Sequence, residues 1–139
     1  MADVAYVALG SNRGDREAHL AAARAGLAAI TRSRVIASSA IEETAPLGPA
    51  GQGPYLNQMV ALETELTPAE LLTELQGIER RAGRVRDVRW GPRIVDLDIV
   101  TMRDQRSDDE RCRVPHPELG NRDFWQRELA ELESLVPHG

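Results

Sequence analysis

The sequence feature that most constrains the fold is the segment Thr67-Pro68-Ala69-Glu70, which combines the polar residues of a helix capping box with a proline at the first helical position. It predicts a helix over residues 68–83. The apolar residues of this helix share one face: Leu71, Leu75 and Ile78. Residues 55–66 alternate between apolar and polar side chains, and residues 94–102 form an apolar run. Both patterns are typical of strands, so this half of the chain predicts a strand, a helix and a strand.

The first part of the chain has the same kind of order. An apolar run over residues 4–9 predicts a buried strand, and Gly10-Ser11-Asn12 after it is interpreted as a turn. Asp15 is a suitable N-cap for a helix. The apolar residues of that helix fall on one face: Leu20, Ala23, Leu27 and Ile30. Residues 34–43 have the length and the β-branched content of a further strand, and a loop rich in glycine and proline follows over residues 44–54.

The predicted order of elements is β-α-β-β-α-β followed by a C-terminal extension. In the extension, residues 103–113 predict a hairpin and residues 127–135 a short helix. This order is that of a ferredoxin-like sandwich, an α+β fold in which an antiparallel sheet carries both helices on one face. At 139 residues the chain is predicted to form one domain, residues 1–139, large enough to bury a core.

Composition excludes several classes of function. The formal net charge of -5 argues against non-specific binding to nucleic acid, which needs a basic surface. The single cysteine, Cys112, cannot form an intramolecular disulfide or a zinc site alone, which favours a reducing compartment. No segment approaches the ~20 apolar residues of a membrane span, and the N-terminus has no signal-peptide pattern. We therefore expect a cytoplasmic protein, and nothing in the sequence requires more than a monomer.

Two aspartates interrupt the apolar run of residues 94–102 at Asp96 and Asp98. Alternate residues of a strand share a face, so their Cα atoms are expected roughly 6.5–7 Å apart. At that separation the carboxylates can share or bridge magnesium ions, and a cation would offset the cost of desolvating them. The alternative is that the pair lies on a solvated strand face.

Four arginines precede this pair: Arg84, Arg86, Arg89 and Arg93. Their planar, permanently charged groups suit polyphosphate, and arginine together with magnesium suffices for phosphoryl transfer. Surface solubility is the alternative interpretation. Clustering beside two aspartates in an acidic protein favours the phosphate site.

Two aromatic residues and one histidine add to the candidate site. Trp90 lies in a loop and Tyr55 lies beside Asn57, so flat apolar faces and an amide are available for a planar heterocycle. Core packing is the alternative for each ring. His116 lies between two prolines that restrict its backbone, which is equally consistent with ligand contact and with a structural hydrogen bond.

Taken together, the chain resembles the 6-hydroxymethyl-7,8-dihydropterin pyrophosphokinase family in six segments that occur in order: VALGSNRGD, TAPLG, YLNQMVALET, IERRAGR, RWGPRIVDLDIV and VPHPELGNRDF. These segments cover most of the chain, and the WGPR and DLDI parts are the most specific. The resemblance implies an enzyme of folate biosynthesis that transfers pyrophosphate from ATP to a pterin alcohol and releases AMP. It implies two small-molecule partners, ATP and 6-hydroxymethyl-7,8-dihydropterin, and neither nucleic acid nor membrane.

The resemblance also implies a role for each candidate residue. Asp96 and Asp98 would hold two magnesium ions against the ATP phosphates, and Arg84 and Arg93 would stabilise the transferring group. The residues implied to contact ATP are Gln76, Arg86, Arg89, Ile99, Arg111, His116 and Arg122. The residues implied to bind the pterin are Thr44, Ala45, Pro46, Leu47, Tyr55, Asn57, Trp90 and Phe124. Glu79 matches a further acidic residue of the family.

Two other hypotheses remain open on the sequence. A relative that binds pterin or nucleotide without turnover is suggested by Asp87 in the arginine segment and by a divergent tail after Phe124. A ferredoxin-like RNA-binding module would need exposed aromatic residues on the sheet and a basic surface. The acidic charge and the few aromatic residues count against this module.

Overall fold

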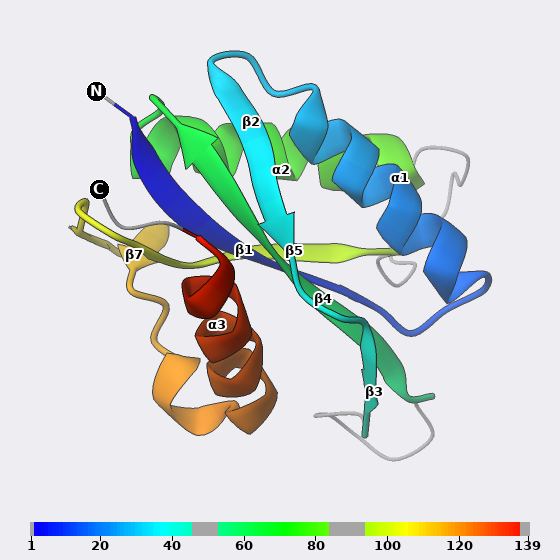
Figure 1. Ribbon diagram of the computed structural model, residues 1–139. Helices are drawn as coiled ribbons and strands as arrows, with labels where there is room; N and C mark the ends of the chain where they lie inside the picture. The colour runs from blue at the N-terminus through cyan, green and yellow to red at the C-terminus, as the bar shows by residue number, and fades with distance from the viewer. Residues whose placement is uncertain (1, 46–52, 84–93, 137–139) are drawn as a thin grey trace.

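The structure, a computed structural model, describes residues 2–45, 53–83 and 94–136 (Figure 1). Its elements are β1 (Asp3–Ser11), α1 (Arg16–Ala28), β2 (Ser33–Ser38), β3 (Glu42–Thr44), β4 (Tyr55–Thr64), α2 (Pro68–Gly83), β5 (Asp96–Met102), β6 (Ser107–Asp109), β7 (Cys112–Val114), the 3-10 helix η1 (Leu119–Asn121) and α3 (Asp123–Leu135). The predicted α+β class is confirmed, and so are both predicted helices of the first 83 residues. Over the described ranges, no helix has the length and apolarity needed to cross a membrane.

The main sheet is antiparallel and has the strand order β2-β4-β1-β5, with β3 pairing to the beginning of β4. Strands β6 and β7 form a separate two-stranded sheet, which confirms the hairpin expected in the C-terminal extension. Strand β1 lies between β4 and β5 and all nine of its residues are buried. A central strand with both faces covered is expected to be apolar in its interior, as β1 is over residues 4–10, between the buried polar residues Asp3 and Ser11 at its ends.

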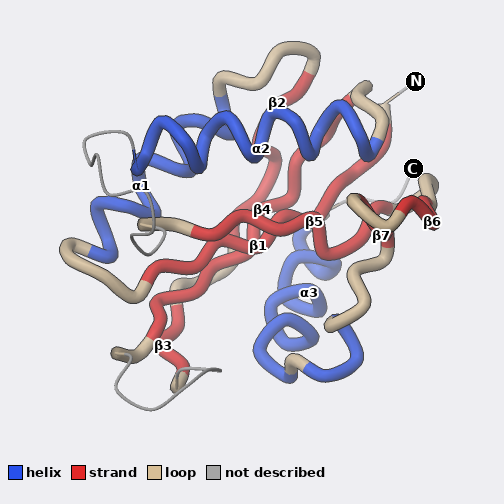
Figure 2. Tube along the Cα trace, turned by 180° about the vertical axis from the view of Figure 1, so that it is seen from behind, coloured by secondary structure: helices blue, strands red, loops and turns tan. Residues whose placement is uncertain are grey.

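Helices cover both faces of the sheet. Helices α1 and α2 lie on one side and α3 lies on the other (Figure 2). The predicted apolar faces of α1 and α2 pack into the first core with alternate residues of the strands: Leu20, Ala23, Leu27, Leu71, Leu75 and Ile78. Trp125 and Leu132 of α3 pack on the opposite face with Tyr6 and Met59. The expectation that the two main helices share a face is confirmed, and the C-terminal extension supplies a third layer.

The strand predicted over residues 34–43 is wrong as a single element, since it is divided into β2 and β3. Ser39 causes the interruption. Its hydroxyl accepts a hydrogen bond from the Met59 N–H (2.9 Å), and its carbonyl accepts one from Gln58 Nε2 (2.8 Å). The Ser39 N–H still donates to the Met59 carbonyl (2.8 Å), but side-chain hydrogen bonds replace the return bond of the ladder at this residue.

Other boundaries also differ from the prediction. Gly10 and Ser11 are the last residues of β1 and not part of a turn. Strand β5 begins at Asp96, two residues later than expected. Helix α3 begins at Asp123, four residues earlier than expected, because its N-cap, Arg122, makes no side-chain capping hydrogen bond that a sequence pattern would reveal.

Candidate active site

Asp96 and Asp98 lie at the beginning of β5 and share one face of the strand. The intervening Leu97 turns into the core under α1 and α2, which confirms the alternation expected from the sequence. Both aspartates are partly exposed, and the Asp98 side chain retains 39% of its exposure. Across the sheet, Asp96 pairs with Gly10 and Asp98 with Ala8. The residues of β1 opposite the two carboxylates therefore carry no bulky side chain.

Gly10 also allows two side chains of β4 to lie close to β1. It pairs with Asn57 of β4 and with Asp96 of β5, so the three residues form one row across the sheet. A Cβ atom on Gly10 would lie 3.3 Å from Asn57 Oδ1 and 3.4 Å from Tyr55 Cδ1. Because glycine has no Cβ, both side chains can rest against β1. The carboxylate pair and the residues predicted to bind a heterocycle thus share one surface.

The charged groups near Tyr55 also show that Asp96 and Arg122 lie close to its side chain. Burial is the main reason that the pKa of Tyr55 lies above its usual range, and the Asp96 carboxylate raises it further while Arg122 lowers it. Arg122 is the residue immediately before α3. The structure therefore brings together residues from β4, β5 and the start of α3 that the sequence analysis assigned to pterin, metal and ATP.

Asn57 is fixed by Thr44. The Asn57 Nδ2 group donates a hydrogen bond to Thr44 Oγ1 (2.5 Å), and Thr44 pairs with Tyr55 at the end of β3. Ala45 follows β3 and is exposed. One edge of the candidate heterocycle site is thus held rigidly by strand pairing.

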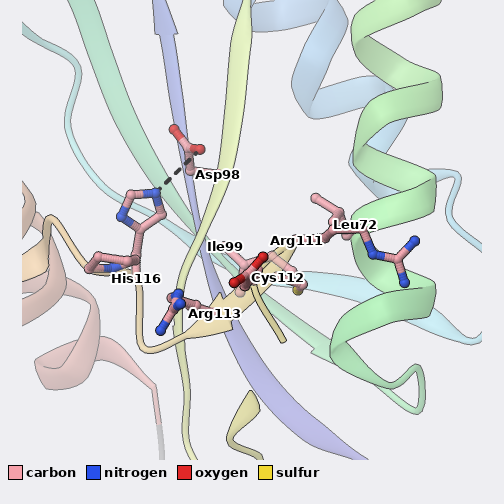
Figure 3. A pocket seen from close by; sticks show the side chains of 9 residues that line it. Leu72, Asp98, Ile99, Arg111, Cys112, Arg113 and His116 are labelled. Atoms are coloured by element: carbon pink, nitrogen blue, oxygen red, sulfur yellow. Dashed lines mark ion pairs between the residues drawn. The ribbon is translucent and has the colours of Figure 1, made fainter. Parts of the chain in front are cut away.

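His116 lies beside Asp98, and its orientation is set by its backbone surroundings. The Glu118 N–H donates to His116 Nδ1 (3.0 Å), so a neutral imidazole carries its proton on Nε2. Nε2 lies 3.8 Å from Asp98 Oδ1, and the two side chains point toward one another (Figure 3). Burial lowers the pKa of His116, and Arg122 lowers it further, although Asp98 and Glu118 oppose the shift. A separation of 3.8 Å is too long for a direct hydrogen bond, so the Nε2 proton remains available to a ligand.

A pocket of about 240 Å³ opens next to this pair (Figure 3). Its lining residues come from α2, β5 and the segment around β7: Leu72, Asp98, Ile99, Glu110, Arg111, Cys112, Arg113, His116 and Pro117. Three of the residues predicted to contact ATP are among them, namely Ile99, Arg111 and His116. Sites for whole drug-sized ligands have volumes from about 300 Å³ upward, so this pocket suits one part of a larger molecule.

Trp125 supports this side of the site, although it is not among the residues predicted from the sequence. Its indole is 2% exposed. The Arg122 guanidinium carbon lies 4.4 Å from the centroid of its ring, and His116 meets it edge to face at 4.9 Å. Phe124 contacts it at 6.3 Å. One buried ring thus positions three predicted ligand residues, and its helical spacing to Leu132 is the signal that could have revealed it.

Helix α2 holds the beginning of β5. The Glu79 carboxylate accepts a hydrogen bond from the Leu97 N–H (2.7 Å), next to Asp96. Gln76 lies on the same helix, is exposed, and is one turn from the pocket residue Leu72. Glu79 therefore ties α2 to the strand that carries the carboxylates.

Seven predicted site residues lie outside the described residues: Pro46, Leu47, Arg84, Arg86, Arg89, Trp90 and Arg93. Within the described ranges, no group of three or more His, Cys, Asp or Glu side chains could hold a metal ion. The Asp96 and Asp98 carboxylates nevertheless fit magnesium, which takes one or two carboxylates and completes its octahedron with water and substrate phosphates.

Comparison with known proteins gives a consistent result. Residues 6–134 match the model of a family described as 7,8-dihydro-6-hydroxymethylpterin-pyrophosphokinase. The chain is 46% identical over 135 residues to the 2-amino-4-hydroxy-6-hydroxymethyldihydropteridine pyrophosphokinase of Bacillus subtilis. The matched segment covers 95% of this chain and 79% of that protein. Proteins of the same name from Pseudomonas aeruginosa (43% over 127 residues; 91% of this chain, 78% of that protein) and Methylorubrum extorquens (45% over 128 residues; 92% and 81%) are also similar. The chain therefore belongs to the 7,8-dihydro-6-hydroxymethylpterin-pyrophosphokinase family.

Proposed function

We propose that the protein transfers pyrophosphate from ATP to the hydroxyl of 6-hydroxymethyl-7,8-dihydropterin in folate biosynthesis, giving AMP and the pterin diphosphate. One observation carries this proposal. Asp96 and Asp98 lie on one face of β5, between the Tyr55 and Asn57 side chains on one side and the pocket beside His116 on the other. ATP phosphates held at the two carboxylates would therefore lie between the proposed pterin site at Tyr55 and Asn57 and the pocket beside His116. Membership of the family supports the same reaction.

The family resemblance implies two magnesium ions, and the carboxylates of Asp96 and Asp98 would hold them. Asp96 and Asp98 supply hard oxygen ligands, and their neighbours Gly10 and Ala8 leave space above the sheet. When bound, magnesium would neutralise charge on the ATP phosphates and hold them in place. His116 would donate its Nε2 proton to a phosphate oxygen.

The protein's part in the reaction is mainly positioning. Tyr55 and Phe124 would hold the pterin ring between them, and Asn57, fixed by Thr44, would bind its polar edge. The pterin hydroxyl oxygen would then release its proton and bond to the β-phosphorus, while the bond from that phosphorus to the oxygen bridging to the α-phosphate breaks and AMP leaves with that oxygen. Ile99 and Arg111, which line the pocket, would contact ATP there. The assignments of Gln76 and Arg122 to ATP rest on sequence resemblance. The assignments of Arg84 and Arg93 to the transferring group, and of Arg86, Arg89 and Trp90 to the substrates, rest on sequence resemblance.

We propose further that the fold is ferredoxin-like and forms a single domain over residues 1–139. The strand order β2-β4-β1-β5, with α1 after β1 and α2 after β4 on one face, supports this topology. The acidic net charge supports partners that are small molecules and not nucleic acid. We expect a cytoplasmic monomer.

An assay of AMP formation tests the function. The protein is incubated with ATP and 6-hydroxymethyl-7,8-dihydropterin, with magnesium and with a chelator. AMP formed only when both substrates and magnesium are present supports the proposal. ADP as the product would refute pyrophosphoryl transfer, and binding of both substrates without AMP would identify a relative that does not turn over.

Gly10→Ala is expected to raise the KM for the pterin about fivefold and the KM for ATP by a smaller factor, since Gly10 also pairs with Asp96. The new Cβ would lie 3.3 Å from Asn57 Oδ1, which would have to move by a few tenths of an ångström, and would touch Tyr55 Cδ1 at 3.4 Å. The expected cost in pterin binding is about 1 kcal/mol. Steady-state kinetics with each substrate varied in turn would measure this. Gly120→Ala is the matched control, because a Cβ there meets nothing within 4 Å. An unchanged KM for the pterin would show that these side chains do not hold the ring.

A further inference from the structure

The hydroxyl of Ser11 continues the contact between β1 and β5 beyond the end of their backbone ladder. Register pairs between the two strands end at Gly10 and Asp96. Ser11 is the next residue of β1, and it is 1% exposed. Its Oγ donates a hydrogen bond to the carbonyl oxygen of Ile94 at 2.7 Å, across 83 positions of sequence. A side chain thus fixes the chain two residues before the first carboxylate.

Asp96 is therefore held between two side-chain hydrogen bonds to the backbone. Ser11 of β1 binds the carbonyl of Ile94 before it, and Glu79 of α2 binds the N–H of Leu97 after it at 2.7 Å. The two bonds come from two different elements, β1 and α2. A strand end is free to fray where its ladder stops, so these contacts set where the Asp96 carboxylate lies relative to Asp98.

We propose that Ser11 is a positioning residue for the Asp96 carboxylate, so that the pair of aspartates is already at the separation a bound divalent cation requires. This inference rests on the proposed function. Ser11 itself faces the Ile94 carbonyl and does not supply a ligand. Its contribution is to keep Asp96 from moving away from Asp98 when the cation is absent, which removes an ordering cost from binding.

The alternative is that Ser11 only satisfies a backbone carbonyl and contributes to stability alone. Ser33 provides the matched control for that alternative. Its Oγ makes a hydrogen bond of the same length, 2.7 Å, to Thr64 Oγ1. Thr64 pairs with Asp3 at the other end of β1, so Ser33 lies far from the aspartates along the sheet.

Direct cation binding distinguishes the two interpretations. Manganese, a paramagnetic substitute for magnesium, is titrated into the full chain with α,β-methylene ATP, in which an uncleavable methylene group replaces the oxygen that bridges the α- and β-phosphorus atoms. Electron paramagnetic resonance then reports free manganese, and thermal unfolding is recorded in parallel. Ser11→Ala is expected to weaken manganese binding about tenfold, the effect that one hydrogen bond commonly controls. Ser33→Ala is expected to stay within twofold, and Ser11→Thr, which keeps the hydroxyl, within threefold.

Three results would overturn the assignment of Ser11: parental affinity in Ser11→Ala, an equal loss in Ser33→Ala, or a loss in Ser11→Thr as large as in Ser11→Ala. If Ser11→Ala does not fold, Ser11→Cys replaces it, since a thiol is a weaker donor. Failure of the parent protein to bind manganese with the ATP analogue would instead contradict the proposed function. The two failures are therefore distinguishable.

Discussion

Asp98→Asn is expected to lower turnover about a thousandfold while the protein remains folded. An amide keeps the size of the side chain but has no charge and only one oxygen, so it is a poor ligand for magnesium. A thousandfold loss corresponds to about 4 kcal/mol of lost transition-state stabilisation, which is the scale of a metal ion acting on a phosphoryl group. Asp96→Asn is expected to have an effect of similar size, because both carboxylates share one face of β5.

The stability of these variants makes the result interpretable. Asp96 and Asp98 are partly exposed and the amide keeps the size of the side chain, so each substitution is expected to leave the melting temperature close to that of the parent. Asp108→Asn is the control, since Asp108 is an exposed aspartate of the separate β6–β7 sheet. AMP release and thermal unfolding are measured for all three variants. Turnover at the parental rate in either Asp96→Asn or Asp98→Asn would exclude the pair as the metal site.

The parts of the fold that local pattern determines were predictable. The capping box does form as expected: the Thr67 hydroxyl accepts from the Glu70 N–H (3.2 Å), and the Glu70 carboxylate accepts from the Thr67 N–H (2.9 Å). This geometry follows from four consecutive residues. The division of the strand over residues 34–43 was not predictable, because it depends on hydrogen bonds between Ser39 and a strand about 20 residues away.

The candidate site shows the same limit. Strand alternation alone places Asp96 and Asp98 on one face. The space beside them depends on the small residues of β1 that lie opposite, Gly10 and Ala8. The register between strands about 86 residues apart cannot be predicted from local sequence. Trp125 was missed for a related reason, since its contacts with His116 and Arg122 depend on how α3 packs on the sheet.

Glu128 is a buried acidic residue that the sequence analysis did not single out, and it predicts how stability depends on pH. It lies on α3 and is 1% exposed. In the described part of the chain neither carboxyl oxygen makes a well-formed hydrogen bond, and the nearest polar side chain is the carboxyl group of Glu42. Burial is the main cause that raises its pKa to about 8, and Glu42 and Glu131 raise it further. Arg127 lowers it but is paired with Glu42 at 2.6 Å. Glu128 is therefore protonated in the folded protein at neutral pH.

The direction of the pH effect follows from the two states. In the unfolded chain the Glu128 pKa returns to its usual value of 4.5, whereas in the folded protein it is about 8. The folded state binds the extra proton between these values, so the stabilisation is complete below pH 4.5 and is lost as the pH rises toward 8. For a shift of this size, the free energy of unfolding is expected to fall by roughly 3–5 kcal/mol across that window.

Glu128→Gln is expected to remove this pH dependence, because the amide keeps the shape of the protonated acid but cannot lose a proton. Urea unfolding at pH 5, 6.5 and 8 would measure it. The variant should match the parent near pH 5 and exceed it at pH 8, whereas Glu133→Gln, an exposed position on the same helix, should follow the parent throughout. Parallel curves for Glu128→Gln and the parent would show that Glu128 is ionised in the folded protein. Helix α3 also carries Phe124 and Trp125, which lie at the candidate site. Loss of the Glu128 proton is expected to loosen this helix. Pterin binding is therefore expected to weaken over the same alkaline range in the parent and not in Glu128→Gln.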